Sequence, residues 1–333
     1  RRSCLICDNA CLQHPWRVFP QTFQGGVLIK KMTDFGAIIK KRQRQDALFN
    51  ILGIACTLIG VVTLGALLAD MLSDGFSRLD AQFFTSFPSR FADRAGILSS
   101  WVGSLMIIAV TAALAVPLGV AAGLYLEEYA SKNWVNTIIE TNIANLAGVP
   151  SIIYGLMALG LLVYGLQLGQ SVLTGGVTLA FLILPIVIVA TREALRTIPQ
   201  GIREAAYAVG STKWQVTRFH LMPYSTGGIL TGVIIALSRA LGETAPLITI
   251  GALTFIAFLP PSPISTEFPF LSFDWIWSPF SVLPIQMFNW VSRPDQDFIV
   301  NAAGAGLALI TMTLTLNAVA IVIRYRMRRS IKW

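Results

Sequence analysis

The chain has 333 residues, of which 54% are hydrophobic and only 13% are charged, and its formal net charge is +8. This composition excludes an ordinary soluble domain and indicates a membrane protein with several spans. Lys and Arg cluster beside apolar runs instead of forming one basic face, so the positive charge indicates control of membrane topology and no binding of nucleic acid.

The first 31 residues differ in character from the chain that follows. They contain three cysteines and a histidine whose spacing superficially suggests a zinc site. Met32 directly precedes a basic stretch suited to a cytoplasmic start, so we interpret residues 1–31 as an extension without a structural role. Residues 32–46 are then a cytoplasmic basic arm, and residues 47–333 are the transmembrane domain.

Six apolar segments follow, each long enough to cross a membrane as a helix. They cover approximately residues 47–72, 98–126, 138–166, 173–190, 226–247 and 298–323. The sequence therefore predicts an all-α, polytopic membrane protein with six transmembrane helices. The third segment contains Gly148, Pro150 and Ser151, which predict a locally broken helix with free backbone groups, suited to a translocation path.

The loops between these segments alternate between basic and nearly neutral. Lys and Arg gather in the N-terminal arm, in the stretch 192–223 and in the C-terminal tail. The opposite side carries only Arg78, Arg90, Arg94 and Arg293. Because basic loops stay in the cytoplasm, both termini and the stretch 192–223 are predicted to be cytoplasmic.

The segment 260–297, between the fifth and sixth spans, is rich in Pro and Trp and is predicted to be external. Trp275, Trp277 and Trp290 suit the lipid headgroup region, and residues 282–291 suit an interfacial helix. A plain covering loop explains the segment equally well.

The stretch 192–223 is polar in an otherwise apolar chain and is predicted to be a loop that carries two short helices. In the first, apolar residues recur at the spacing of one face of an amphipathic helix: Ile202, Ala205, Ala206 and Val209. Gly210 suits the position that ends such a helix. Thr212 and Gln215 form a capping-box pattern that opens the second helix, which Pro223 closes.

Two opposite charges, Arg239 and Glu243, lie inside the fifth apolar segment. A charge at the bilayer centre costs about 2.5–3.5 kcal/mol on insertion scales, so it faces the bundle interior or water and finds a partner. Their spacing of four residues places both on one helix face, where they neutralise each other. Hydrogen bonds between helices explain the other polar residues in or near the spans equally well: Glu140, Asn142, Asn145 and Asn317.

The sequence carries no constellation typical of an enzyme. It has no G-x-x-x-x-G-K-[ST] phosphate loop, no G-x-S-x-G nucleophile elbow and no two histidines at metal-ligand spacing. A protein of this kind that moves a substrate uphill takes its energy from another polypeptide or from an ion gradient.

One motif in the stretch 192–223 resembles a known family. Three residues separate Glu204-Ala205-Ala206 from Gly210, and nine more precede His220-Leu221-Met222-Pro223. This pattern resembles the EAA loop of ABC importer permeases, which usually have Ile and Leu where His220 and Met222 stand. In that family the loop forms a coupling helix seated in a groove of the cytoplasmic ATPase. The resemblance assigns ATPase coupling to Glu204, Ala205, Ala206, Gly210 and Pro223.

A second resemblance is more specific. Residues 238–247, Ser-Arg-Ala-Leu-Gly-Glu-Thr-Ala-Pro-Leu, resemble the signature of phosphate importer permeases, and residues 117–129 and 145–156 are similar to other segments of the same proteins. Two homologous permeases, an A-type and a C-type, make up the phosphate-specific transport system. The Ala-Pro after Gly-Glu-Thr, together with residues 280–286, resembles the A-type permease more than its C-type partner. The resemblance covers the chain from Met32 onward.

This resemblance implies a type I ABC importer permease in the bacterial inner membrane, surrounded by membrane lipid. The chain would form half of a phosphate pathway beside the homologous C-type permease, with an external phosphate-binding protein and a cytoplasmic ATPase dimer as further partners. No cofactor or metal is expected in this chain, because ATP and Mg belong to the ATPase. The expected pathway residues are Arg239, Glu243, Thr244, Ser151 and Pro150.

Two interpretations of the Arg239 and Glu243 pair stay open. In the first, Arg239 offers a transient fork to passing phosphate and Glu243 holds down the net charge of the pathway. In the second, the two residues form a permanent salt bridge that locks spans together.

Two other functions also stay open. One is a permease of the same architecture for another oxyanion, such as molybdate or sulfate. The other is an ion-driven secondary transporter or a membrane sensing component that works without an ATPase. Uptake competition would test the first alternative, and co-purification of an ATPase would argue against the second.

Overall fold

The computed structural model describes residues 25–131, 133–252, 255–262 and 272–330, and all regular structure in these ranges is helical. The chain divides into two compact units, Arg1–Leu67 and Leu68–Trp333. The described part of the first unit is residues 25–67 of helix α1 (Gly25–Gly75), which contains the first predicted span and ends in the second unit. Residues 1–24 lie outside the described residues, whereas residues 25–31 belong to α1.

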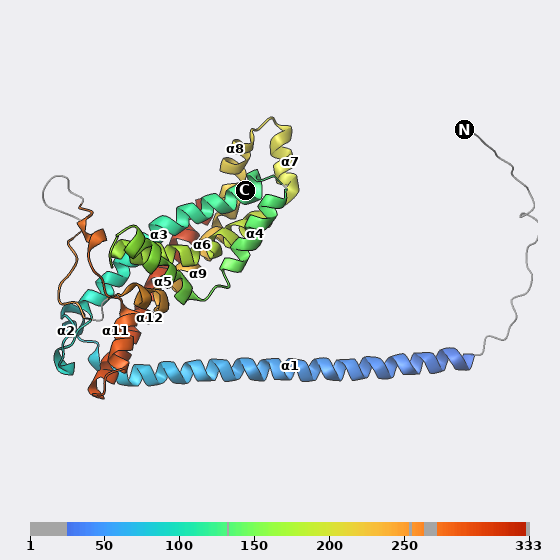
Figure 1. Cartoon of the computed structure of the whole chain (residues 1–333). Coiled ribbons are helices and arrows are strands. Elements are labelled where there is room, and N and C mark those ends of the chain that lie inside the picture. Colours follow the sequence, from blue (N-terminus) through green and yellow to red (C-terminus); the bar gives the residue numbers. More distant parts are fainter. Residues whose placement is uncertain (1–24, 132, 253–254, 263–271, 331–333) are drawn as a thin grey trace, which may run out of the picture. The chain divides into compact units, whose positions relative to one another are not determined.

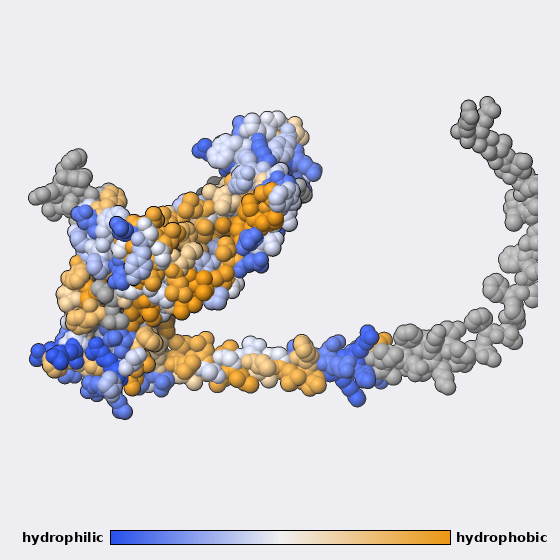
Figure 2. Space-filling model, in the orientation of Figure 1, coloured by the Kyte–Doolittle hydropathy of each residue, from blue (hydrophilic) through white to orange (hydrophobic). Residues whose placement is uncertain are grey.

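Long helices form the body of the second unit. Besides α1, four helical runs are long and apolar enough to cross a membrane: Leu98–Tyr129, Val172–Arg196, Lys213–Gly242 and Asp297–Met327. Counted as one span, a bent pair of shorter helices brings the number to six. The polytopic all-α fold is therefore confirmed. Figure 2 shows apolar surface along the middle of this unit and hydrophilic surface at its two ends, as a membrane protein requires.

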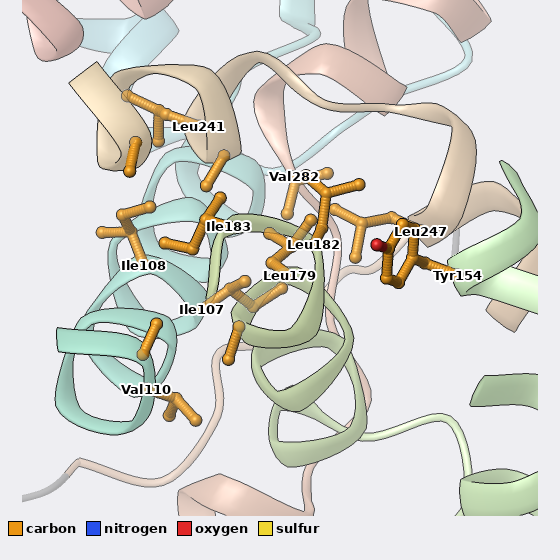
Figure 3. Close-up of a cluster of buried hydrophobic side chains, with 14 of the residues drawn as sticks. Ile107, Ile108, Val110, Tyr154, Leu179, Leu182, Ile183, Leu241, Leu247 and Val282 are labelled. Carbon is orange, nitrogen blue, oxygen red and sulfur yellow. The ribbon is translucent and has the colours of Figure 1, made fainter. Parts of the chain in front are cut away.

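The helix α6 (Val172–Arg196) is central in the second unit and packs against α3 (Leu98–Leu124) and α9 (Met222–Gly242). Apolar side chains of these helices meet in the main core, where Ile107, Leu179 and Ile183 are almost fully buried (Figure 3). Small residues allow the close approach. A Cβ atom at Gly119 of α3 would lie 2.7 Å from the Cγ1 atom of Val187 in α6.

The third span is broken, as the sequence predicts. Its halves are α4 (Trp134–Leu146) and α5 (Ser151–Ala158), which continues as a π-helical segment to Gly165, and the axes of the two halves differ by 104°. Pro150 is the N-cap of α5, and proline disfavours helical backbone in the residue before it. The hydroxyl of Tyr154 donates to the carbonyl of Leu146 at 2.8 Å and bridges the break.

The start of the fifth span differs from the prediction. The sequence predicts that Pro223 closes a short helix, but the helix continues: α8 (Lys213–Gln215), a π-helical turn (Val216–Leu221) and α9 follow one another without a gap. Because the run is continuous, Pro223 lies inside it, directly after the π-helical turn, and its missing N–H group removes one helical hydrogen bond there. The capping box of Thr212 and Gln215 is confirmed.

The opposite end of this unit holds a smaller core around α11 (Leu283–Val291) and α2 (Ala81–Thr85), against the start of α12 (Asp297–Ser330) (Figure 1). Trp290 is fully buried there, with ring centroids 6.0 Å from Phe83 and 6.3 Å from Phe298. The prediction that Trp290 lies at the lipid headgroups is therefore wrong, because α11 turns this face toward protein.

Candidate functional site

A short helix, α7 (Gln200–Ala208), follows the end of α6 and lies with α8 at one end of the second unit (Figure 1). Pro199 is its N-cap, and Gly210 has a φ of +83°, a left-handed conformation that suits glycine. The predicted loop is shorter than expected, because α6 continues to Arg196.

Only half of the predicted apolar face of α7 is buried. Ile202 and Ala206 pack into a small core with residues of α6, the π-helical turn and α3: Leu195, Ile198, Val216, Leu221 and Leu124. Ala205 and Val209 are exposed instead, Val209 to 82%. For Val209 the reason is that α7 ends at Ala208, so this fourth position of the pattern falls outside the helix.

The predicted coupling residues therefore separate into two groups. Glu204 and Ala205 are exposed on α7, and Gly210 is exposed in the turn that follows it. Ala206 holds α7 to the body, and Pro223 stands apart in α9.

Large apolar side chains are also exposed on α7 and on the segment after it. These are Tyr207, Val209, Trp214 and Phe219, with exposed fractions of 44–82%. Grouped exposed apolar side chains on a hydrophilic end of a protein indicate a protein-binding surface. The sequence prediction missed Trp214 and Phe219, although aromatic residues in so polar a stretch are a usable signal.

An ion-pair cluster joins α7 to the end of the second span. The Nη2 atom of Arg203 in α7 lies 2.7 Å from the Oε1 atom of Glu128, and the two side chains are 16% and 8% exposed. The same guanidinium donates to the carbonyl oxygens of Ile198 at 2.8 Å and Leu195 at 3.1 Å. Arg203 therefore binds the carbonyls of Leu195, near the end of α6, and of Ile198, just after it, as well as one buried carboxylate.

The cluster continues through Arg192, which is 9% exposed in α6. Its Nη2 atom lies 2.8 Å from the Oε2 atom of Glu140 in α4, and its Nε atom lies 3.3 Å from the Oε2 atom of Glu127. Arg196 also reaches Glu127, at 3.1 Å. Sequence reasoning counted these arginines only as topology signals. A usable signal in the sequence was the adjacent pair Glu127 and Glu128 at a basic membrane face, because two neighbouring carboxylates there need cationic partners.

The predicted pathway residues Arg239, Glu243 and Thr244 lie where the fifth span ends. The helix α9 ends at Gly242, not at 247 as predicted, Glu243 has extended backbone, and α10 (Ala245–Ile250) begins after Thr244. The Nε atom of Arg239 lies 3.2 Å from the Oε1 atom of Glu243, and their side chains are 45% and 19% exposed. The pair forms as predicted, but at a helix end, where a cation is favourable.

The remaining pathway residues lie in the neighbouring element. The helix α5 packs tightly on α10, since a Cβ atom at Gly155 would lie 2.6 Å from backbone atoms of Pro246 and would collide with the hydroxyl of Thr249. Pro150 and Ser151 begin α5. In the described part of the chain, no hydrogen bond connects them to Arg239 or Glu243.

Two further polar contacts cross between helices. Ser238 of α9 donates to the Oδ1 atom of Asn317 in α12 at 2.6 Å, and Glu140 pairs with Arg192. Within the described ranges, no group of three or more His, Cys, Asp or Glu side chains is arranged to hold a metal ion.

Comparisons with known proteins agree with this architecture. The sequence model of the family described as "Binding-protein-dependent transport system inner membrane component" matches residues 115–333. The chain is 33% identical to the phosphate transport system permease protein PstA of Haemophilus influenzae, over 72% of this chain and 85% of that protein. It is 30% identical to the probable ABC transporter permease protein YqgI of Bacillus subtilis, over 77% of this chain and 87% of that protein.

A solved structure supports the fold. A chain of the bacterial alginate ABC transporter, in complex with a periplasmic protein bound to an alginate pentasaccharide, is 12% identical, with a TM-score of 0.59 over 86% of this chain and 97% of that chain. The overall fold is thus that of an ABC importer permease. The chain belongs to the family of binding-protein-dependent transport system inner membrane components.

Proposed function

We propose that this chain is the membrane-spanning component of an ATP-driven phosphate importer and forms half of its translocation pathway. The observation that carries the proposal is the pair of exposed Arg239 and partly buried Glu243 at a helix break, in a family member whose relatives include phosphate permeases. An arginine fork suits the planar, multidentate recognition of phosphate oxygens. The homologous C-type phosphate permease is proposed to form the other half of the pathway.

The exposed surface of α7 suits a cytoplasmic ATPase dimer as the energy source. Glu204, Ala205 and the apolar side chains around them offer a rigid, two-turn projection that a groove can hold. ATP and Mg are proposed to bind only that partner, and this chain is proposed to have no catalytic site or cofactor of its own. An external phosphate-binding protein would deliver the substrate, and both termini would be cytoplasmic.

The test is uptake of radiolabelled phosphate into proteoliposomes that contain this chain, the C-type permease and the ATPase, with ATP inside and the phosphate-binding protein outside. We expect uptake that requires ATP, competes with arsenate and is insensitive to molybdate and sulfate. Uptake that molybdate or sulfate abolishes would assign the chain to another oxyanion. ATP-independent uptake driven by an ion gradient would reject the ATPase partner.

Replacing Glu204 by alanine, or Gly210 by valine, is expected to uncouple ATP hydrolysis from uptake while membrane insertion is kept. Glu204 is exposed on α7, and valine at Gly210 would strain a backbone that has positive φ. The measurement is ATPase stimulation by the loaded binding protein beside phosphate uptake. Gly201→Ala is the matched control, because its new methyl group meets nothing within 4 Å. Normal stimulation together with normal uptake in both variants would refute the assignment.

A further inference from the structure

Arg203 contacts three elements at once. Its backbone belongs to α7, while its guanidinium binds carbonyl oxygens at the end of α6 and the carboxylate of Glu128 beyond α3. Glu128 is 8% exposed, and among the described residues Arg203 is the one cation paired with it. Breaking such a pair leaves a buried charge without a partner, which strongly disfavours any motion that separates the two side chains.

Apolar packing reinforces the same connection. Ile202 and Ala206 of α7 lie in one small core with Leu124 of α3. The chain itself links α7 only to α6, through residues 197–199, and to α8, through residues 209–212. Without Arg203 and this core, a push on α7 would reach α3 only indirectly.

The cluster then extends to the broken span. Arg192 of α6 pairs with Glu127, the neighbour of Glu128, and with Glu140 of α4. Two sets of ion pairs, Arg203 with Glu128 and Arg192 with Glu127 and Glu140, are thus joined by the peptide bond between Glu127 and Glu128. Together they connect α7, the end of the second span and the first half of the third, which leads to the break before α5.

We propose that Arg203 is a positioning residue that makes α7 and the adjacent end of the second span move as one body. A displacement of α7 by the ATPase then reaches the second span in the same step as α6, and Arg192 carries it to α4. The inference rests on the proposed function, because it needs an ATPase that displaces α7. The inference goes beyond the proposed function because it names the side chain that transmits the motion of α7 to the second span.

The first test measures this motion directly in the assembled transporter. Spin labels are attached at Gln200, in the first turn of α7, and at Ser131, just after the second span, both exposed. The native cysteines, including the exposed Cys56, are replaced beforehand. We expect the same interlabel distance in the resting complex and in the complex trapped with ADP and beryllium fluoride. A distance that shifts between the two states would overturn the proposal, because the elements would then move separately.

The second test asks whether Arg203 acts through Glu128. Arg203→Gln and Glu128→Gln are each expected to lower uptake by about tenfold, with the ATPase still bound and its basal activity kept, but with its stimulation by the loaded binding protein lost. Uptake by Arg203→Lys should lie between the uptake of the wild type and that of Arg203→Gln, because lysine keeps the charge but cannot reach three acceptors. Arg203→Gln should also broaden the distance distribution between the labels.

The matched control is Arg196→Gln, which removes a more exposed arginine that does not touch α7. Because water screens its ion pairs, uptake should stay near the wild-type rate. Wild-type uptake and stimulation in Arg203→Gln would overturn the proposal. The distance between the labels does not depend on which anion is carried. An error in the phosphate assignment would therefore be recognised separately, by competition of molybdate or sulfate with phosphate uptake in the wild-type complex.

Discussion

Replacing Arg239 by alanine is expected to lower phosphate uptake by tenfold or more, because a hydrogen bond to a charged group contributes about 1.5–3 kcal/mol. The chain should still insert into the membrane, since the arginine is 45% exposed at the end of α9 and supports no buried core. Uptake by proteoliposomes of matched protein content is the measurement. Arg90→Ala, which removes another exposed arginine, serves as the control.

The double variant Arg239→Ala/Glu243→Ala separates the two roles of the pair. If the pair only locked spans together, removing both charges at once would restore transport. For a phosphate fork, the double variant should insert and fold normally but should still fail to import phosphate. Arg239→Lys should lose part of the activity, because it keeps the charge without the planar fork. A double variant that imports phosphate at the wild-type rate would contradict the pathway role.

Replacing Gly155 by leucine is expected to stop transport by separating α5 from α10. Any side chain at this position meets the backbone of Pro246 and the hydroxyl of Thr249, and neither can move far without shifting α10. Overpacking of this kind costs about 1–3 kcal/mol, so the variant should also unfold at a lower temperature. The measurements are phosphate uptake and thermal unfolding in detergent.

The matched control is Gly160→Ala, in the π-helical part of the same broken span, where a new methyl group meets nothing within 4 Å. It should transport normally. A Gly155→Leu variant with wild-type uptake and unfolding temperature would show that α5 and α10 do not need this close contact.

Local signals in the sequence predicted a large part of the fold. Long apolar runs located the spans, Gly148 and Pro150 predicted the break in the third, and the capping box of Thr212 and Gln215 forms as expected. Each of these features depends on a few neighbouring residues, so a pattern read along the chain is enough to find it.

What the sequence could not predict depends on contacts between distant segments. Arg203 and Glu128 are 75 positions apart, and nothing local to either residue specifies the other. Trp290 looked like a headgroup anchor because its burial against Phe83 depends on how α11 packs. Similarly, the hydropathy of residues 226–247 continues through the end of α9, so it gave no sign that the helix stops at Gly242.

The π-helical turn Val216–Leu221 also determines the direction in which Arg239 points from the axis of its helix. The turn opens one continuous helical run, Lys213–Gly242, which begins beside α7 and ends just after Arg239. Each residue of an α-helix advances by about 100° around the axis. A π-helical turn holds an extra residue compared with an α-helical one, so deleting one residue from it would change the azimuth of Arg239 relative to α7, with almost no change in composition. The azimuth of the arginine around its helix is thus determined at the far end of that helix, close to twenty positions away in the sequence.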